Sequence, residues 1–582
     1  MNPGKTLTTL TPVKLWFYLS LTLAIICGIL GIIPALSHQY IVQDDARSHV
    51  FWMARFINPE LFPNDIIADY FQSVAPQGYT NLYKLFSLIK IPPLLLNKIL
   101  PIILGLITTI YCFEIAIQIL PIPLAGFLST LLLNQNLWLK DDLISGTPRA
   151  FFYPLFLGFL HYFLKKSSLG IIITITLLGL FYPQGVFLSA ALLTLDFLHF
   201  RNQQKLTILT IGLTTAFLIL LPYALNTSEY SPIITLTQAK KLPEFFPGGR
   251  ASFFSNNNFD FWLTGDRSGI IPPEWLSQYF LPPQVWAGLL LFIFLSFKKR
   301  FLTQKITNKI ILLPELALAS TGIFLAAHLL LFRLHHPSRY SQHSFRIIMA
   351  LAGGIAFTLI IDIIRKKLHL LNHSSKNKPF QKIKTISISI SIYIVLTLLL
   401  LYPALTNNFP LTNYVVGKAP QLYEYLAQQP SDIRIASLAL EANNIPTFAK
   451  RSILVSSEYA LPYHQGYYSQ IKQRAKDLIQ AQYSPNLEQV KKIIHKYKID
   501  FWLLDSQALT LEYVRKNHRL QQLNNTATTL ITAQMENGVI PSLLNVQESC
   551  RVLDIQDLVL LEAKCILEFR IEKDFFSMDP YN

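Results

Sequence analysis

The chain has 582 residues, of which 51% are hydrophobic and only 14% carry a charge. Soluble globular proteins have about 25% charged residues, and the mean hydropathy of this chain is positive, so its composition excludes an ordinary soluble globule. The net charge of +16 would suit a nucleic-acid partner. Most of the excess, however, lies in short loops between apolar segments, where membrane topology alone predicts it, and we exclude nucleic-acid binding.

Apolar segments long enough to cross a hydrocarbon core of about 30 Å recur up to residue 405. The segment 169–200 is too long for one helix and has Tyr-Pro-Gln-Gly at its middle, which predicts two shorter helices joined by a turn. The sequence therefore predicts a polytopic α-helical membrane protein with about eleven transmembrane helices. The other predicted spans are 13–36, 99–119, 122–138, 148–164, 205–225, 284–297, 310–332, 344–364 and 385–405.

Lysine and arginine in short loops are retained on the cytoplasmic side of a membrane. Residues 365–384 contain seven of them and residues 298–309 contain five, both without an acid. This pattern predicts a cytoplasmic N-terminus, and an odd number of spans then places residues 406–582 on the extracytoplasmic side. The strict asymmetry favours a bacterial inner membrane. The same predicted topology places four loops on the extracytoplasmic side, at 38–98, 134–147, 226–283 and 333–343.

Two adjacent acids, Asp44 and Asp45, follow the first span directly. After them, apolar residues recur at helical spacing, which predicts one amphipathic helix lying on the membrane surface with the acids at its head. An aspartate here would also suit the N-cap of that helix, so a capping role stays open beside a catalytic one. The predicted apolar stripe consists of Ala46, Val50, Met53 and Ile57.

A second acidic pair, Asp141 and Asp142, lies in the next outer loop, shortly before Arg149. Ionised carboxylates near hydrocarbon are costly, so such groups normally have a cationic, metal or substrate partner. Arg149 is one local candidate for that partner. A helix cap or a salt bridge with Lys140 or Arg149 is the plain structural alternative to a functional role.

Basic residues at the start of the tenth span break the positive-inside tendency of the other loops. If Pro337 begins this helix, Arg339, His343 and Arg346 fall on one face. Arginine clusters bind phosphate oxygens through charge-assisted contacts, so this face predicts an anion site. Headgroup contact or a structural ion pair is the alternative. We expect the long third outer loop to act as a partly mobile lid.

Residues 406–582 predict a separate small α/β domain, with a helix at 487–497 and strands at 452–456 and 499–504. Cys550 and Cys565 both lie in this domain and are able to form a disulfide if the fold brings them together. The sequence contains no nucleotide-binding fingerprint and no Cys/His cluster with metal-ligand spacing.

The order of these features resembles the GT-C superfamily of integral-membrane glycosyltransferases. The branch it resembles most contains the protein O-mannosyltransferases and the lipid A aminoarabinose transferases. Asp44-Asp45-Ala46-Arg47 is similar to the Asp-Glu-Ala-Arg segment that follows the first span in many of these enzymes. The likeness extends to about Tyr230. The second acidic pair departs from the family pattern, because Asp141-Asp142 forms no Asp-x-Asp motif.

The resemblance implies a polyprenyl-phosphate sugar donor, used on the outer face with a lipid, glycan or protein acceptor. It implies Asp44 as the general base of an inverting single displacement, with Asp45 as its helper and as the helix cap. Asp141 or Asp142 would bind the acceptor or, if one is needed, a divalent cation such as Mg or Mn. The donor phosphate would be held by Arg149, Arg339, His343 and Arg346.

Two other classes of function remain open at this point. A transporter or flippase for a lipid-linked substrate would have ionisable residues within its spans, and Glu114, Asp196 and Glu315 are the candidates. A non-catalytic membrane scaffold would use its outer domain to bind a partner.

Overall fold

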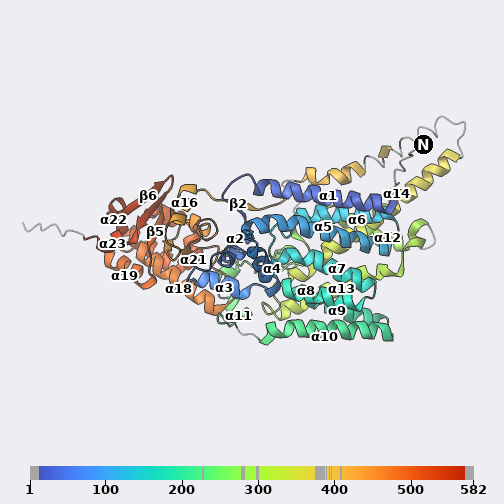
Figure 1. The fold of residues 1–582 in the computed structure, drawn as a ribbon, viewed down its shortest axis with the longest axis horizontal. Coiled ribbons are helices and arrows are strands. Elements are labelled where there is room, and N and C mark those ends of the chain that lie inside the picture. The colour runs from blue at the N-terminus through green and yellow to red at the C-terminus, as the bar shows by residue number, and fades with distance from the viewer. Residues whose placement is uncertain are drawn as a thin grey trace, which may run out of the picture.

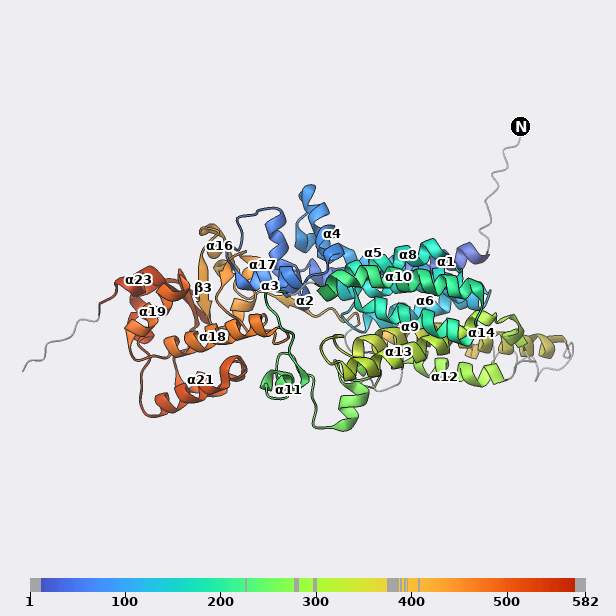
Figure 2. The same cartoon turned by 90° about the horizontal axis from the view of Figure 1, so that it is seen from below.

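The structure is a computed structural model that describes residues 12–225, 228–276, 282–296, 301–373, 387, 390, 391, 394, 396–406 and 409–570. A bundle of roughly parallel helices forms one end of the molecule and a sheet-containing domain forms the other (Figure 1). The short elements α2 (Asp44–His49), α3 (Ile66–Val74) and β2 (Tyr414–Val416) lie between them. The turned view keeps this order, with α2 and α3 again at the junction (Figure 2).

The bundle is built from apolar helices, as the sequence predicted. Among the described residues, five helical stretches are long and apolar enough to cross a membrane: Pro12–Ala35, Pro93–Ile119, Gln203–Leu225, Asn308–Leu329 and Ser338–Lys366. Only part of the last predicted span, 385–405, lies within the described residues. The bundle helices are α1 (Pro12–Ala35), α5 (Pro93–Ile119), α6 (Pro123–Trp138), α7 (Phe152–Leu164), α8 (Ser168–Phe181), α9 (Gln184–His199), α10 (Gln203–Leu225), α12 (Pro283–Ser296), α13 (Leu312–Leu329) and α14 (Ser338–His373).

The sheet domain confirms the predicted α/β character. Its five strands lie in the order β4 (Ser452–Ile453), β3 (Arg434–Ser437), β5 (Phe501–Asp505), β7 (Leu558–Glu562) and β6 (Arg551–Ile555). β3 is parallel to both of its neighbours, and β7 is antiparallel to both of its own. The helices are α16 (Pro420–Gln428), α17 (Ile445–Phe448), α18 (Gln465–Gln482), α19 (Leu487–Tyr497), α20 (Leu511–Lys516), α21 (His518–Glu536), α22 (Leu543–Cys550) and α23 (Ala563–Glu568).

The first loop contains β1 (Ile41–Gln43), α2, α3 and α4 (Gln77–Leu88). The predicted single helix through Ile57 is wrong, because α2 ends at His49 and a 3₁₀ helix, η1 (Phe51–Phe56), follows it. Packing overrides helical periodicity here: Phe51 and Trp52, outside the predicted stripe, are buried, while Ile57 is exposed. Residues 44–56 therefore form two short helices packed against the rest of the protein, and they do not form one continuous helix on the membrane surface.

Two long-range connections tie the first loop and the third loop to the sheet domain. β1 pairs antiparallel with β2, with Ile41 opposite Val416. The third loop, described at 228–276, contains α11 (Leu236–Ala239) and has its own apolar cluster, in which Phe245 and Phe253 pack on Phe332. This packing makes it a folded insertion between the two ends of the molecule.

Candidate functional site

The first acidic pair forms the first two residues of α2, directly after β1. The N-cap of α2 is Gln43, whose side-chain oxygen accepts hydrogen bonds from the backbone N–H groups of Asp45 and Ala46, at 2.9 and 3.2 Å. The expectation that Asp45 caps the helix is therefore wrong, because glutamine takes that place. Neither carboxylate is engaged in capping α2, so both are available for other partners.

The second acidic pair lies in a tight loop, 139–147, after α6. Ser145 closes this loop by donating from its N–H to the Asp141 carbonyl at 3.0 Å and from its hydroxyl to the Asp142 carbonyl at 2.8 Å. Gly146 follows with a φ of +57°, and its position is so close to Asn97 that an added Cβ would lie 2.6 Å from the Asn97 amide nitrogen. The backbone of the loop therefore fixes where both acids lie.

Arg149 joins the two acidic pairs. Its guanidinium forms an ion pair with Asp45, lies 3.1 Å from Asp141 and lies 3.2 Å from Asp142. Asp141 is also held by the side-chain amides of Gln43, at 3.3 Å, and Asn413, at 3.1 Å. Three carboxylates from two loops that are far apart in the sequence thus surround one cation.

The basic face of α14 meets Asp142. The side-chain nitrogens of Arg339, His343 and Arg346 each lie 3.4 Å from an Asp142 oxygen. Arg346 also pairs with Glu274 at 2.5 Å, and the Tyr153 hydroxyl, 2.8 Å from His343 Nδ1, donates to Asp142 at 3.3 Å. Asp142 is thus the centre of the cationic face.

The two acidic pairs differ in their exposure. The side chains of Asp44 and Asp45 are 41% and 33% exposed, whereas those of Asp141 and Asp142 are 15% and 1% exposed. Asp44 pairs with Arg47 at 2.6 Å. The first pair is therefore the more accessible to a substrate, and Asp142 of the second pair is enclosed by protein.

The electrostatics of the site favour ionised carboxylates. Burial alone would raise the pKa of Asp142, but Arg149 and the neighbouring cations hold it well below its ordinary value. Burial likewise opposes ionisation of Asp45, and the positive charge of Arg149 lowers its pKa. Both groups are poised as carboxylates at neutral pH.

The guanidinium of an arginine occupies the space between the carboxylates of the site. Within the described part of the chain, no three His, Cys, Asp or Glu side chains are placed to hold a metal ion. The guanidinium of Arg149 lies among the oxygens of Asp45, Asp141 and Asp142.

The structure brings together all eight residues that the sequence singled out, around the junction of bundle and sheet domain. Asp44 is linked through Arg47 to Glu458 of the sheet domain. We use the term charged site for these residues. Sequence reasoning missed several of their partners. Gln43 and Tyr153 lie close in the sequence to Asp44 and Arg149. The other missed partners come from distant segments without a local signal: Glu274, Asn413 and Glu458.

The sequence matches no protein-family model and no curated protein, but the structure resembles solved membrane enzymes. The archaeal oligosaccharyltransferase AglB from Archaeoglobus fulgidus, solved with an inhibitory peptide and a dolichol-phosphate, matches with a TM-score of 0.53 and 12% identity, over 89% of this chain and 72% of its own. The apo form of the oligosaccharyltransferase from that organism matches with a TM-score of 0.50 and 13% identity, over 88% and 72%.

A third similar structure is ArnT from Cupriavidus metallidurans in the apo state. It has a TM-score of 0.46 and 11% identity, and the match covers 96% of this chain and 100% of that one. The two Archaeoglobus structures carry the likeness in fold. Their matches cover 89% and 88% of this chain, so they include most of the helical bundle and most of the sheet domain.

Proposed function

The chain has the GT-C fold of integral-membrane glycosyltransferases, and we propose that it transfers a sugar from a polyprenyl-phosphate-linked donor to a hydroxyl-bearing acceptor. The observation that carries this proposal is the charged site itself. It combines exposed carboxylates, at Asp44 and Asp45, with an arginine cluster around Arg149 and Arg339. Glycosyl transfer from a lipid phosphate needs both: a base for the acceptor and cations for the leaving phosphate.

In the proposed reaction, Asp44 accepts the proton of the acceptor hydroxyl. The acceptor oxygen forms a bond to the anomeric carbon of the sugar while the bond from that carbon to the phosphate oxygen breaks. The phosphate leaves with the electron pair, and a single displacement of this kind inverts the configuration at the anomeric carbon. Asp45, paired with Arg149, orients that arginine toward the leaving group.

The cationic side chains of the charged site differ in their exposure, and we assign them different roles on that basis. Arg339 is 20% exposed and has one contact with Asp142, at 3.4 Å, so it and Arg149 are suited to contact the donor phosphate. Arg346 and His343 are almost fully buried. We assign them the role of holding Asp142 in place, with Asp142 in turn anchoring Arg149 and Arg339, whose side chains are 14% and 20% exposed. The side-chain amides of Gln43 and Asn413 orient Asp141. Because Asp142 holds the arginines, Asp141 is the acid of the second pair that we assign to binding the acceptor.

We place the charged site and residues 406–582 on the extracytoplasmic face, with residues 1–405 as the membrane domain. The distribution of lysine and arginine between loops supports this orientation. The disulfide between Cys550 and Cys565 supports it too, because disulfides persist in oxidising compartments. The same reasoning favours a bacterial inner membrane.

Two of the three acidic candidates for a transport path, Asp196 and Glu315, are engaged in ion pairs, which favours transfer over transport. Asp196 pairs with Lys205 at 2.5 Å, and Glu315 pairs with His199 at 2.9 Å. These pairs belong to α9, α10 and α13 and are separate from the charged site. A transport path would need accessible ionisable groups within the spans.

The substitution Asp44→Asn tests the proposal. We expect transfer from a radiolabelled polyprenyl-phosphate sugar, measured in membranes that contain the full-length protein, to fall by about 10²- to 10⁴-fold, because the general base is lost. Asp69→Asn is the matched control: Asp69 lies in the same loop, is 40% exposed and pairs with an arginine, Arg55. Full activity of Asp44→Asn at wild-type protein levels would remove Asp44 from the mechanism.

A further inference from the structure

Four charged side chains form a continuous series of ion pairs that joins α2 to the sheet domain and to the third loop: Asp44, Arg47, Glu458 and Arg250. Arg47 Nη2 lies 2.6 Å from Asp44 Oδ1 and 2.9 Å from Glu458 Oε2. Arg250 Nη2 lies 2.5 Å from the other oxygen of Glu458, Oε1. In the sequence, Glu458 is 411 residues from Arg47 and 208 residues from Arg250, so the tertiary fold alone assembles this chain of charges.

The sheet domain holds Arg47 by several contacts. Arg47 Nη1 donates to the side-chain oxygen of Asn444 at 3.0 Å. The backbone carbonyl of Arg47 accepts a hydrogen bond from the Thr447 hydroxyl at 3.2 Å. Arg47 and Glu458 are both buried, with side chains 8% exposed. A buried charge without a partner is strongly unfavourable, so Arg47 and Glu458 depend on each other for their positions.

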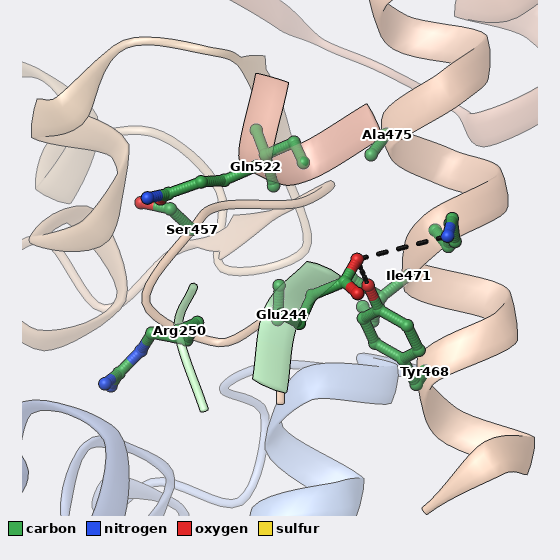
Figure 3. Close-up of a pocket in the computed structure, with 10 residues that line it drawn as sticks. Glu244, Arg250, Ser457, Tyr468, Ile471, Ala475 and Gln522 are labelled. Carbon is green, nitrogen blue, oxygen red and sulfur yellow. Dashed lines mark hydrogen bonds and ion pairs between the residues drawn. The ribbon is translucent and has the colours of Figure 1, made fainter. Parts of the chain in front are cut away.

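Arg250 brings the third loop into the same network. Figure 3 shows that its side chain points away from Glu244. Its guanidinium donates instead to Glu458, from Nε to the backbone carbonyl at 3.2 Å and from Nη2 to the carboxylate. Glu244 has separate partners, the hydroxyl of Tyr468 and Lys472 at 3.9 Å. Of these two acids, Glu458 is the one connected to Asp44.

We propose that Glu458 is a positioning residue for the candidate base. It holds the guanidinium groups of Arg47 and Arg250, so that Arg47 is directed to one oxygen of Asp44 and the positive charge of both arginines is neutralised. Without Glu458, the buried Arg47 and the partly exposed Arg250 would face Asp44 and Asp45 with one negative charge fewer, and α2 would lose one of its anchors to the sheet domain. This inference rests on the proposed function of Asp44.

Two substitutions of Glu458 separate a charge role from a space-filling role. Glu458→Gln keeps the size and removes the charge that Glu458 carries above its pKa, which burial raises to about 7. In assays well above that pH, we expect kcat for sugar transfer to fall by about 10- to 100-fold, because the reacting groups lose their alignment. The donor KM should change by less than about twofold. Glu458→Asp keeps the charge and should retain more of kcat than Glu458→Gln. The opposite order, with Gln more active than Asp, would overturn the inference.

Asp477→Asn is the matched control, because Asp477 is an ion-paired acid of the same domain whose partner, Lys496 at 2.6 Å, also lies in that domain. We expect this variant to keep kcat within about twofold of the wild type. An equal loss in Asp477→Asn and Glu458→Gln would show a general weakening of the domain and would also overturn the inference.

Hydrogen exchange provides a measurement that needs no activity. In the purified full-length protein, Glu458→Gln should raise the exchange rate of the backbone amides of α2 several-fold, and Asp477→Asn should leave it unchanged. Unchanged exchange at α2 in Glu458→Gln would contradict the positioning role. If the wild type forms no product from a polyprenyl-phosphate sugar, the proposed function fails, and the exchange at α2 still decides the role of Glu458.

Discussion

At the scale of single residues, the two acidic pairs look alike in sequence but have different surroundings. Asp44 and Asp45 are partly exposed at the start of α2, whereas Asp142 is 1% exposed and lies among Arg149, Arg339 and Arg346. Asp141 is 15% exposed, so Asp142 is the one acid of the four that protein encloses almost completely. Asp142 is the negative centre that allows several arginines to lie close together.

Asp142→Asn should destabilise the folded protein, because it leaves buried arginines without their shared counter-charge. We expect a loss of about 3–5 kcal/mol, seen as a lower unfolding temperature of the detergent-purified protein. Asp260→Asn, at an exposed acid, is the control. An unfolding temperature equal to the wild type would show that Arg149 and Arg346 are satisfied without Asp142.

The same residue predicts a pH dependence. The pKa of Asp142 is lower in the folded chain than the unperturbed value of 3.8, so its contribution to stability is present above that value. The contribution is lost as the pH falls from there through the folded-state pKa. Below pH 3.8, the unfolding temperatures of wild type and Asp142→Asn should therefore converge.

At the scale of elements, the loop 139–147 shows how a short turn sets the site. Its shape depends on the positive φ of Gly146 and on the close approach of Asn97. A residue with a Cβ is strained in this backbone conformation, and here it also meets the Asn97 amide and carbonyl oxygen. The loop is therefore intolerant of side chains at this one position, although the sequence around it is ordinary.

Gly146→Ala should lower the unfolding free energy by about 1–3 kcal/mol and displace the second acidic pair. Sugar transfer should fall with it, because Arg149 is held by that pair. Gly322→Ala is the matched control, since a Cβ added at Gly322 in α13 has no neighbour within 4 Å. Wild-type stability and transfer in Gly146→Ala would show that the loop adapts without cost.

At the scale of the whole molecule, the charged site lies where the bundle, the third loop and the sheet domain meet (Figures 1 and 2). The β1–β2 pairing holds the first acidic pair at this junction, and Glu458 and Asn413 reach it from beyond the bundle. The sheet domain thus takes part in building the site, and its removal should disturb α2 directly.

Residues 406–582 should be accessible from the extracytoplasmic side of the membrane. In Cys550→Ser, the partner Cys565, which lies partly exposed in α23, becomes a free thiol. A membrane-impermeant maleimide should label it in intact cells, whereas the double variant Cys550→Ser/Cys565→Ser should remain unlabelled because Cys27 and Cys112 are buried. Labelling that requires opened membranes would place the sheet domain in the cytoplasm.

The sequence by itself determined the membrane class and most of the helices, and it singled out the candidate residues of the charged site. Membrane spans can be predicted from the sequence because each span must by itself be long and apolar. The acidic pairs and the basic face of α14 can be recognised in the sequence because they depend only on the spacing of nearby residues. The helix at 487–497 was likewise predicted at its observed bounds.

Arg149 was a candidate partner of the second acidic pair from the sequence, but only the tertiary structure decided the other partners of the charges. Arg149 lies between both acidic pairs, Gln43 takes the N-cap expected of an aspartate, and Glu458 reaches Arg47 across 411 residues. The division of α2 from η1 was also decided by packing around Phe51 and Trp52. Ion pairs and burial depend on what the fold brings within a few ångströms, and no local pattern in a single sequence encodes that distance.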